Sequence, residues 1–430
     1  MTQGAGAALP PQGALSGGMT DARPPLNDPS HDLPWLQDTA HRAFLTDDAR
    51  RQLAFFDRSL RGDGGFDALA WDGSALPRGA QELHVTTRMV HSYVLAGRIG
   101  HPDAGRMVDA GMAHLWDRHR DAEHGGYVWG VAPDGGVGRG EKLAYGHVFV
   151  LLAASSATIA GHPDAGRLMD DIRAVIEARF WDEDAGRLRE EFGRDWSRIS
   201  GYRGMNANMH GVEGMLAAFE ATGVRVWLDR ARRVLAFFTD EVAAAWDWRI
   251  PEHYREDWSV DPDYAGDPMF RPKGTTPGHS LEWARLALQG WDLAGRPDDG
   301  TPDRARRLTL RALEDAWRDD GGLVYTLEGG APARRERLWW PVTEGIGALA
   351  ALLKIGGGEG VEEWYRPLWR HAAEAHVDRD RGGWYPAIDE DGRPTDGVFE
   401  GKPDLYHALQ ADLFPLVPGL SRQVEALGAV

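Results

Sequence analysis

Histidine, glutamate, arginine and amide side chains recur at nearly equal intervals along this chain. The six anchors of the pattern are His84, His147, His210, His279, Glu344 and His407, separated by 63, 63, 69, 65 and 63 residues. The same segments also contain Arg88, His91, Tyr145, Asn206, Glu213, Glu282 and Gln410. Because an imidazole both accepts and donates protons near neutral pH, this set predicts acid–base chemistry at one shared site.

Two of the segments contain a histidine followed three residues later by a glutamate. His210 and Glu213, and likewise His279 and Glu282, therefore share one face of a helix. A carboxylate beside an imidazole fixes its tautomer and raises its basicity, so we expect Glu282 to tune His279. Such residues could also bind a divalent cation. Their order reverses the Glu-x-x-His motif of di-iron bundles, and the chemistry below needs no metal or other cofactor, so none is predicted.

Short glycine-containing turns divide the chain into units. They lie at 64–66, 125–127, 186–188, 321–323 and 382–384, and most neighbouring copies are 61 residues apart. The wide gap between Gly186 and Gly321 predicts a degenerate copy near Asp247 and Trp248, with an insertion at 257–274. The chain therefore consists of six units.

Each unit contains two kinds of helical segment. Before the turns lie amphipathic stretches such as 103–117, 164–180 and 304–317. After them lie flatter, more apolar stretches, at 84–97, 143–161, 206–223, 279–295, 340–356 and 404–417. Six buried and six half-solvated helices predict an all-α fold, an (α/α)6 barrel with brief β-hairpins at one end. An open superhelical solenoid of helix pairs is the alternative.

The barrel also predicts where the polar anchors lie. In such a barrel the inner helices are parallel, and the anchors lie near their N-terminal ends, so all should meet at one end of the central cavity. Taken singly, His84, His91 or His147 is better explained as a core histidine with satisfied hydrogen bonds. The recurrence of polar residues at equivalent positions in six units favours a functional cavity instead.

Composition and net charge exclude several classes of partner and site. The 430 residues carry a formal net charge of −18, which disfavours nucleic acid and anionic membranes as partners. No apolar run approaches the roughly 18 residues that a transmembrane helix needs. Without cysteine there are no disulfides, thiol nucleophiles or Cys-ligated metals. The 18 tryptophans fit either a carbohydrate pocket or a Trp-rich core.

The domain organisation follows from the same patterns. Residues 1–30 are rich in Gly, Ala and Pro and lack the features of a signal peptide, so we expect a disordered leader. Residues 31–430 are expected to form a single catalytic barrel, located in the cytoplasm. The expected oligomeric state is either a monomer or a homo-oligomer.

Several motifs resemble one family. They are the runs 203–210 (RGMNANMH), 278–285 (GHSLEWAR) and 401–407 (GKPDLYH), together with 87–89 (TRM) and 248–253 (WRIPEH). They resemble the N-acylglucosamine 2-epimerase superfamily, most closely its aldose–ketose isomerase branch, which includes the mannose and sulfoquinovose isomerases. The resemblance covers about residues 35–417 and follows the six-unit period.

The resemblance implies metal-free sugar isomerisation on an (α/α)6 barrel. By position, His279 and His407 correspond to the acid/base pair, and Glu282 to the residue that orients the chemistry. Arg88, which would stabilise the developing enediolate charge, is counted with these three as catalytic. The residues predicted to bind substrate are Asn206, His210, Tyr145, Glu344, Trp384 and Asp404.

The expected reaction interconverts D-mannose and D-fructose through a cis-enediol, with D-lyxose and D-xylulose as a further pair. We expect His407 to move the proton between C1 and C2 and His279 to open the ring. Alternatives are a sugar 2-epimerase, of the N-acylglucosamine or cellobiose type, and a sulfoquinovose isomerase. A more distant alternative is an (α/α)6 glycoside hydrolase using two of Glu213, Glu282 and Glu344. A non-catalytic sugar-binding barrel would not need the histidine pair.

Overall fold

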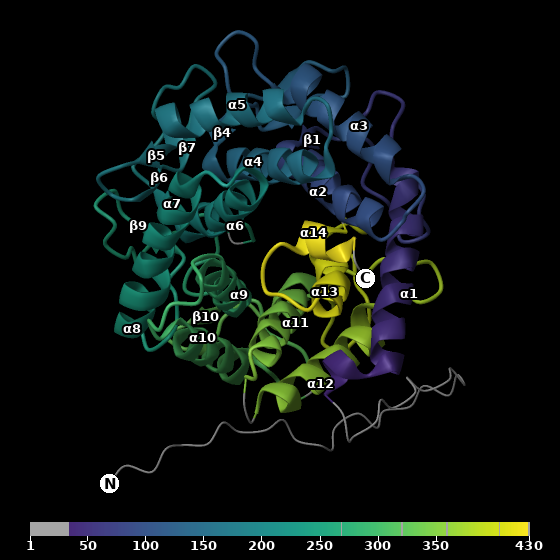
Figure 1. The fold of residues 1–430 in the computed structure, drawn as a ribbon, viewed down its shortest axis with the longest axis vertical. Helices are drawn as coiled ribbons and strands as arrows, with labels where there is room; N and C mark the ends of the chain where they lie inside the picture. Colours follow the sequence, from purple (N-terminus) through teal and green to yellow (C-terminus); the bar gives the residue numbers. More distant parts are fainter. Residues whose placement is uncertain (1–33, 268, 320, 358–359, 404, 429–430) are drawn as a thin grey trace.

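Twelve helices form two concentric layers in the computed structural model (Figure 1). The structure describes residues 34–267, 269–319, 321–357, 360–403 and 405–428, so the predicted leader at 1–30 lies outside the described residues. The inner helices are α2 (Leu83–Arg98), α4 (Ala144–Ala160), α6 (Met205–Thr222), α9 (Pro277–Leu293), α11 (Trp339–Lys354) and α13 (Tyr406–Leu416). The outer helices are α1 (Thr39–Phe56), α3 (Ala104–His114), α5 (Ala165–Val175), α7 (Arg225–Leu235), α10 (Thr301–Ala316) and α12 (Val361–His371). The predicted (α/α)6 fold is confirmed.

The two layers differ in how their residues are buried. Helix α4 is buried around most of its circumference, from Gly146 through Ala157. Helix α7 buries only Trp227, Leu228, Ala231, Val234 and Leu235, which form one stripe at helical spacing. Each inner helix contacts the next, and α13 contacts α2, so the inner layer is a closed ring. This closure distinguishes the fold from an open solenoid.

Short antiparallel strands gather at one end of the ring. The paired strands are β1 (Gln81–Glu82) with β2 (Gly130–Val131), β2 with β3 (Val137–Arg139), β4 (Lys142–Leu143) with β7 (Glu191–Phe192), β5 (Trp181–Asp182) with β6 (Arg187–Leu188), β8 (Arg203–Gly204) with β9 (His253–Tyr254), β10 (Leu327–Glu328) with β11 (Ala331–Pro332), and β12 (Arg337–Leu338) with β13 (Ala387–Ile388). Strands β1, β4, β8 and β12 each run directly into an inner helix. The strands therefore bring the N-termini of these inner helices to the same end.

The degenerate sixth turn is visible in the backbone. Gly125 and Gly126, and likewise Gly382 and Gly383, have positive φ. At the predicted degenerate copy, Asp247 and Trp248 adopt φ of 53° and 61° instead. The left-handed conformation costs a non-glycine residue about 1–2 kcal/mol, so the turn geometry is kept here although its glycines are absent.

The remaining short elements connect or extend the main helices. They are the α-helical turns α8 (Ala243–Ala245) and α14 (Gln423–Leu427), the 3₁₀ turns Trp35–Gln37 and Asp57–Ser59, and the π-helical turns Leu115–His119, Ile176–Phe180, Ala236–Val242 and Ala372–His376. Each π-helical turn extends the C-terminus of an outer helix. Among the described residues, no helix combines the length and apolar character needed to cross a bilayer.

The first and last parts of the ring are joined by a buried pair of acids. Asp48 of α1 and Asp412 of α13 are fully buried, and the Gln52 amide donates to both carboxyls, at 3.1 and 2.5 Å. The Trp384 indole also donates to Asp48, at 2.8 Å. Burial, and then the neighbouring Asp48, raise the pKa of Asp412 well above its usual value, so it holds a proton that the two acids share.

This pair predicts a pH-dependent stability. Because the pKa of Asp412 is raised on folding, the stability it contributes is complete below the unfolded-state pKa of about 4 and is lost as pH rises through the folded-state pKa. Asp412→Asn keeps the shape but cannot ionise. We therefore expect its melting temperature, relative to the unmodified protein, to increase steadily from pH 5 to pH 9 in thermal unfolding scans.

The matched control is Asp47→Asn, whose side chain is 64% exposed and paired with Arg50. It should show no such trend. A difference between Asp412→Asn and the unmodified protein that does not change with pH would contradict a shared proton.

Candidate active site

His407, at the start of α13, is held by a buried carboxylate. Its Nδ1 lies 2.9 Å from Glu344 Oε1 on α11. The other oxygen of Glu344 accepts from Arg285 Nε and Nη2 on α9, at 3.2 and 3.0 Å. Burial alone would raise the pKa of Glu344, but the Arg285 charge and the His407 hydrogen bond lower it. An ionised Glu344 can only accept, so Nδ1 of His407 carries the proton and Nε2 is left to receive one.

His279 has a carboxylate partner that sequence reasoning missed. Its Nδ1 lies 2.9 and 3.0 Å from the two oxygens of Glu252, which precedes β9. Glu252 also accepts from the Thr276 amide at the N-terminus of α9, at 3.1 Å. Glu252 is therefore fixed relative to the helix that carries His279. The two histidines lie against one indole, since the Trp340 ring centroid is 4.8 Å from that of His279 and 6.1 Å from that of His407.

The prediction that Glu282 tunes His279 is wrong. Glu282 Oε1 instead lies 3.3 Å from Arg285 and 3.6 Å from His210 Nδ1. The three-residue spacing does place both side chains near one helix face, but Glu252 from a neighbouring loop takes the Nδ1 position. A motif within one helix could not reveal this partner from another segment.

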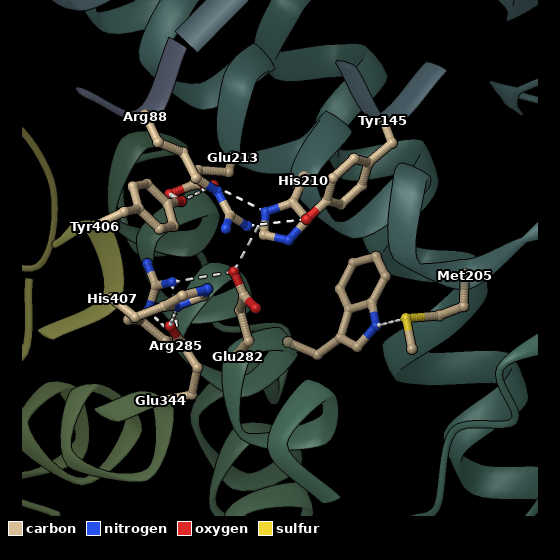
Figure 2. A network of polar contacts seen from close by, with 11 residues as sticks. Arg88, Tyr145, Met205, His210, Glu213, Glu282, Arg285, Glu344, Tyr406 and His407 are labelled. Carbon is tan, nitrogen blue, oxygen red and sulfur yellow. Dashed lines mark hydrogen bonds and ion pairs between the residues drawn. The ribbon is translucent and has the colours of Figure 1, made fainter. Parts of the chain in front are cut away.

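Arg88 lies against two aromatic rings, and Figure 2 shows its guanidinium beside Tyr406 and the Tyr145 hydroxyl. Its guanidinium carbon is 4.6 Å from the Phe149 ring and 4.7 Å from the Tyr406 ring. Its Nη2 donates to the Tyr145 hydroxyl at 2.9 Å, and the Tyr406 hydroxyl donates to Glu213. These contacts hold the guanidinium in a fixed position.

Burial sets the charges of the remaining acids and His210. It lowers the pKa of His210 to about 4, so this imidazole is neutral near pH 7, and its Nδ1 donates to Glu213 at 3.1 Å. Burial, and then Glu344, raise the pKa of Glu282 well above its usual range. A protonated Glu282 leaves Glu213 and Glu344 as anions opposite Arg88 and Arg285. Among the described residues Glu282 Oε2 has no hydrogen-bond partner, so this buried oxygen can donate its proton to a ligand.

Three of these residues also have the spacing of a metal site. One atom each of His210, Glu213 and Glu282 lies within 4.8 Å of the others. The same groups are already engaged, Glu213 by His210 and Tyr406, and Glu282 by Arg285. Arg88 and Arg285 supply positive charge beside them. The donor set therefore fits internal hydrogen bonding better than a dication.

The other three predicted residues differ in their placement. Asn206, at the start of α6, has a buried Oδ1 without a hydrogen-bond partner among the described residues, so it can accept a hydrogen bond from a hydroxyl group. The structure does not bring Trp384 into the cluster, because its indole packs at the end of α12 and donates to Asp48. Asp404 lies outside the described residues.

Three of the recurring histidines have structural contacts. Both ring nitrogens of His147 bond the backbone, Nδ1 with the Leu143 carbonyl and Nε2 with the Tyr127 amide, at 2.8 and 3.0 Å. His91 bonds Ser156 at 2.7 Å. His84 stacks on Trp129 at 5.2 Å.

Comparison with known proteins gives a consistent result. The family model described as N-acylglucosamine 2-epimerase matches residues 64–411. A D-mannose isomerase of Thermobifida fusca is 43% identical over 406 residues, which cover 92% of this chain and 99% of that protein. A D-mannose isomerase of Pseudomonas cannabina pv. alisalensis is 39% identical, over 89% of this chain and 94% of that protein. A crystal structure of a D-mannose isomerase superposes with a TM-score of 0.82 at 29% identity, over 87% and 97% of the two chains.

The Glu252 contact yields a specific prediction. Glu252→Gln retains an acceptor for the Thr276 amide but removes the negative charge that faces His279. Loss of a supporting carboxylate of this kind typically costs about 10–100-fold in activity, so we expect a fall of that size in kcat with KM nearly unchanged. Steady-state kinetics, with melting temperature as the check on folding, measures this.

Glu123→Gln, at a carboxylate that is 66% exposed, serves as the control and should leave kcat unchanged. Full activity of a folded Glu252→Gln protein would show that the Glu252 charge plays no part.

Proposed function

Since the chain belongs to the N-acylglucosamine 2-epimerase family and is an isomerase, we propose that it interconverts D-mannose and D-fructose by histidine-mediated proton transfer. The observation that carries this proposal is the pair of imidazoles that both lie against Trp340. Each has its Nδ1 held by a buried carboxylate, Glu252 or Glu344. Each therefore has Nε2 available for a substrate proton.

Ring opening comes first, because the closed sugar has no carbonyl group. A proton must reach the ring oxygen and another must leave the anomeric hydroxyl. We assign this exchange to His279. Glu252 stabilises the imidazolium that forms when His279 takes a proton, and the same imidazolium then serves as the acid.

Isomerisation follows from the open aldose. We assign His407 Nε2 as the base that removes the proton from C2, which gives a cis-enediolate. Return of that proton to C1, with transfer of the O2 hydroxyl proton to O1, yields the ketose, so that atoms and charge balance. Arg88 and a protonated Glu282 are the positive and neutral donors that can stabilise the enediolate oxygens, while Asn206 and His210 can bind hydroxyls.

The same site could also return the proton to C2 from the opposite face, which would produce an epimer. The ketose needs only that the protonated His407 faces C1, whereas the epimer needs a proton donor on the face of C2 opposite to His407. The relatives at 43% and 39% identity are D-mannose isomerases, which favours the ketose as product and mannose as substrate.

The chemistry can be tested with one labelled reaction. We expect incubation with D-mannose in heavy water to produce D-fructose, detected by NMR, with deuterium entering C1 to the extent that the shuttled proton exchanges. The rate should survive treatment with EDTA. Glucose as the major product would indicate an epimerase, and activity restored only by a divalent cation would overturn the metal-free mechanism.

Replacing the two histidines tests the assignment. His407→Ala and His279→Ala should each lower kcat by ~10²–10⁴, the usual worth of a positioned acid–base group. His279→Ala should retain more activity on a substrate trapped in the open-chain form, because that substrate needs no ring opening.

His124→Ala, at an exposed histidine whose ring is paired with Glu123, is the control. Circular dichroism verifies folding. Wild-type rates in both folded histidine variants would refute the pair, and new reducing ends released from an oligosaccharide would support a hydrolase instead.

A further inference from the structure

A second polar cavity lies outside the active-site cluster, beside strands β7 and β8. Its volume is about 310 Å³, and its walls include Arg179, Arg189, Arg198, Arg203, Glu190 and Ser200. We call it the arginine cavity. None of the side chains drawn in Figure 2 lines it. A cavity of this size is at the lower end of the range for small-molecule sites.

Neighbouring carboxylates hold two of the arginines in place. Arg189 donates to Asp182 at 3.0 Å, and Arg198 donates to Glu256 at 2.7 Å. Each contact uses one edge of a guanidinium that has five N–H donors, so other donors remain for a ligand. Arg179 has no carboxylate partner among the described residues, and its guanidinium lies 5.1 Å from the Trp196 ring. Its charge is therefore not neutralised by an ion pair.

The buried part of the cavity contains one more cation and an unusual acid. Arg203 is 8% exposed, donates to the Tyr202 carbonyl at 2.9 Å and lies 3.9 Å from Glu256. Glu190 is 7% exposed, and its Oε2 is buried with no partner. Burial raises the pKa of Glu190 to about 7, so below that pH it offers an O–H donor rather than a second negative charge. Arg271, 3.8 Å from Glu190, pairs with Glu191 at 2.9 Å.

These groups make a local excess of positive charge in a chain whose net charge is −18. The five guanidiniums named here face four carboxylates, of which Glu190 is partly protonated at neutral pH. Guanidinium groups bind phosphate oxygens through paired N–H donors, and a protonated carboxyl adds a further donor. We propose that the arginine cavity binds a phosphate group, either free or as an ester of a small molecule.

The cavity is connected to the active site through two strands. Arg203 lies on β8, which leads directly into α6 and Asn206. Glu191 lies on β7, which pairs with β4, and β4 leads into α4 and Tyr145. A ligand in the cavity therefore contacts the strands from which two active-site helices begin. The binding proposal does not depend on the reaction assigned above.

Calorimetric titration at low ionic strength tests it, with inorganic phosphate and glycerol 3-phosphate as probes and glycerol as the uncharged control. We expect saturable binding of one equivalent of phosphate group, weakened about tenfold or more in Arg179→Ala, which removes an exposed arginine without an ion pair. Tighter binding of glycerol 3-phosphate would identify a phosphate ester as the ligand, and equal binding would identify free phosphate.

Two controls locate the site. Arg225→Ala removes an arginine that is 62% exposed and paired with Asp229 on α7, and should leave affinity unchanged. Arg88→Ala should also leave it unchanged, since Arg88 belongs to the active site. Absence of saturable binding, equal loss in Arg179→Ala and Arg225→Ala, or loss only in Arg88→Ala would overturn the proposal.

The pH dependence provides an independent readout. Ionisation of Glu190 above pH about 7 places a negative charge beside the bound anion, which opposes binding between pH 6 and pH 8. The ionisation of phosphate itself is common to both proteins, so the affinity of Glu190→Gln relative to the unmodified protein should rise across this range, because glutamine stays neutral. An identical pH dependence in both proteins would exclude Glu190 from the site.

Discussion

The active-site geometry depends on the contacts of the buried Arg285. Its guanidinium bonds both Glu282 and Glu344, and through Glu344 it fixes His407. Breaking such a buried pair typically costs about 3–5 kcal/mol, because the remaining charge is left without a partner. Gly347 on α11 makes room for this side chain, since a Cβ there would lie 3.0 Å from Arg285 Cδ. The packing of α9 against α11 therefore also determines the orientation of His407.

The ring of helices turns that local constraint into a complete site. Each inner helix contributes between one and three polar groups to the site, and most of the rest of its surface is apolar and packed against its neighbours. At Gly214 a Cβ would lie 2.8 Å from the Val148 carbonyl oxygen, so the absence of a side chain permits close packing of α6 on α4. Since close-packed cores deform little, the helices hold groups from distant segments at fixed distances. Catalytic precision here derives from the fold as a whole.

The sequence reveals the helices more completely than the contacts between them. The 61-residue period, the apolar inner segments and the degenerate turn at Asp247 and Trp248 all have direct counterparts in the structure. Glu252 and Arg285 were not singled out as site residues. Glu252 lies in a loop, where no periodic pattern marks it. Arg285 looks like an ordinary helical residue in the sequence, and only the packing of α11 against α9 shows its partner. These pairings join side chains from different segments, so residue spacing within one helix cannot predict them.

The state of the carboxylates also bears on which chemistry this barrel supports. A glycosidase needs two carboxyl groups facing the scissile bond, one acting as acid and the other as nucleophile or base. Here Glu213 and Glu344 each hold a histidine, and Glu282 contacts Arg285. The free groups on these pairs are imidazole nitrogens, which suit reversible proton transfer near neutral pH, and the buried Oε2 of Glu282. Because these acids contact histidines or an arginine, the site is better suited to moving a proton within a sugar than to cleaving a bond between sugars.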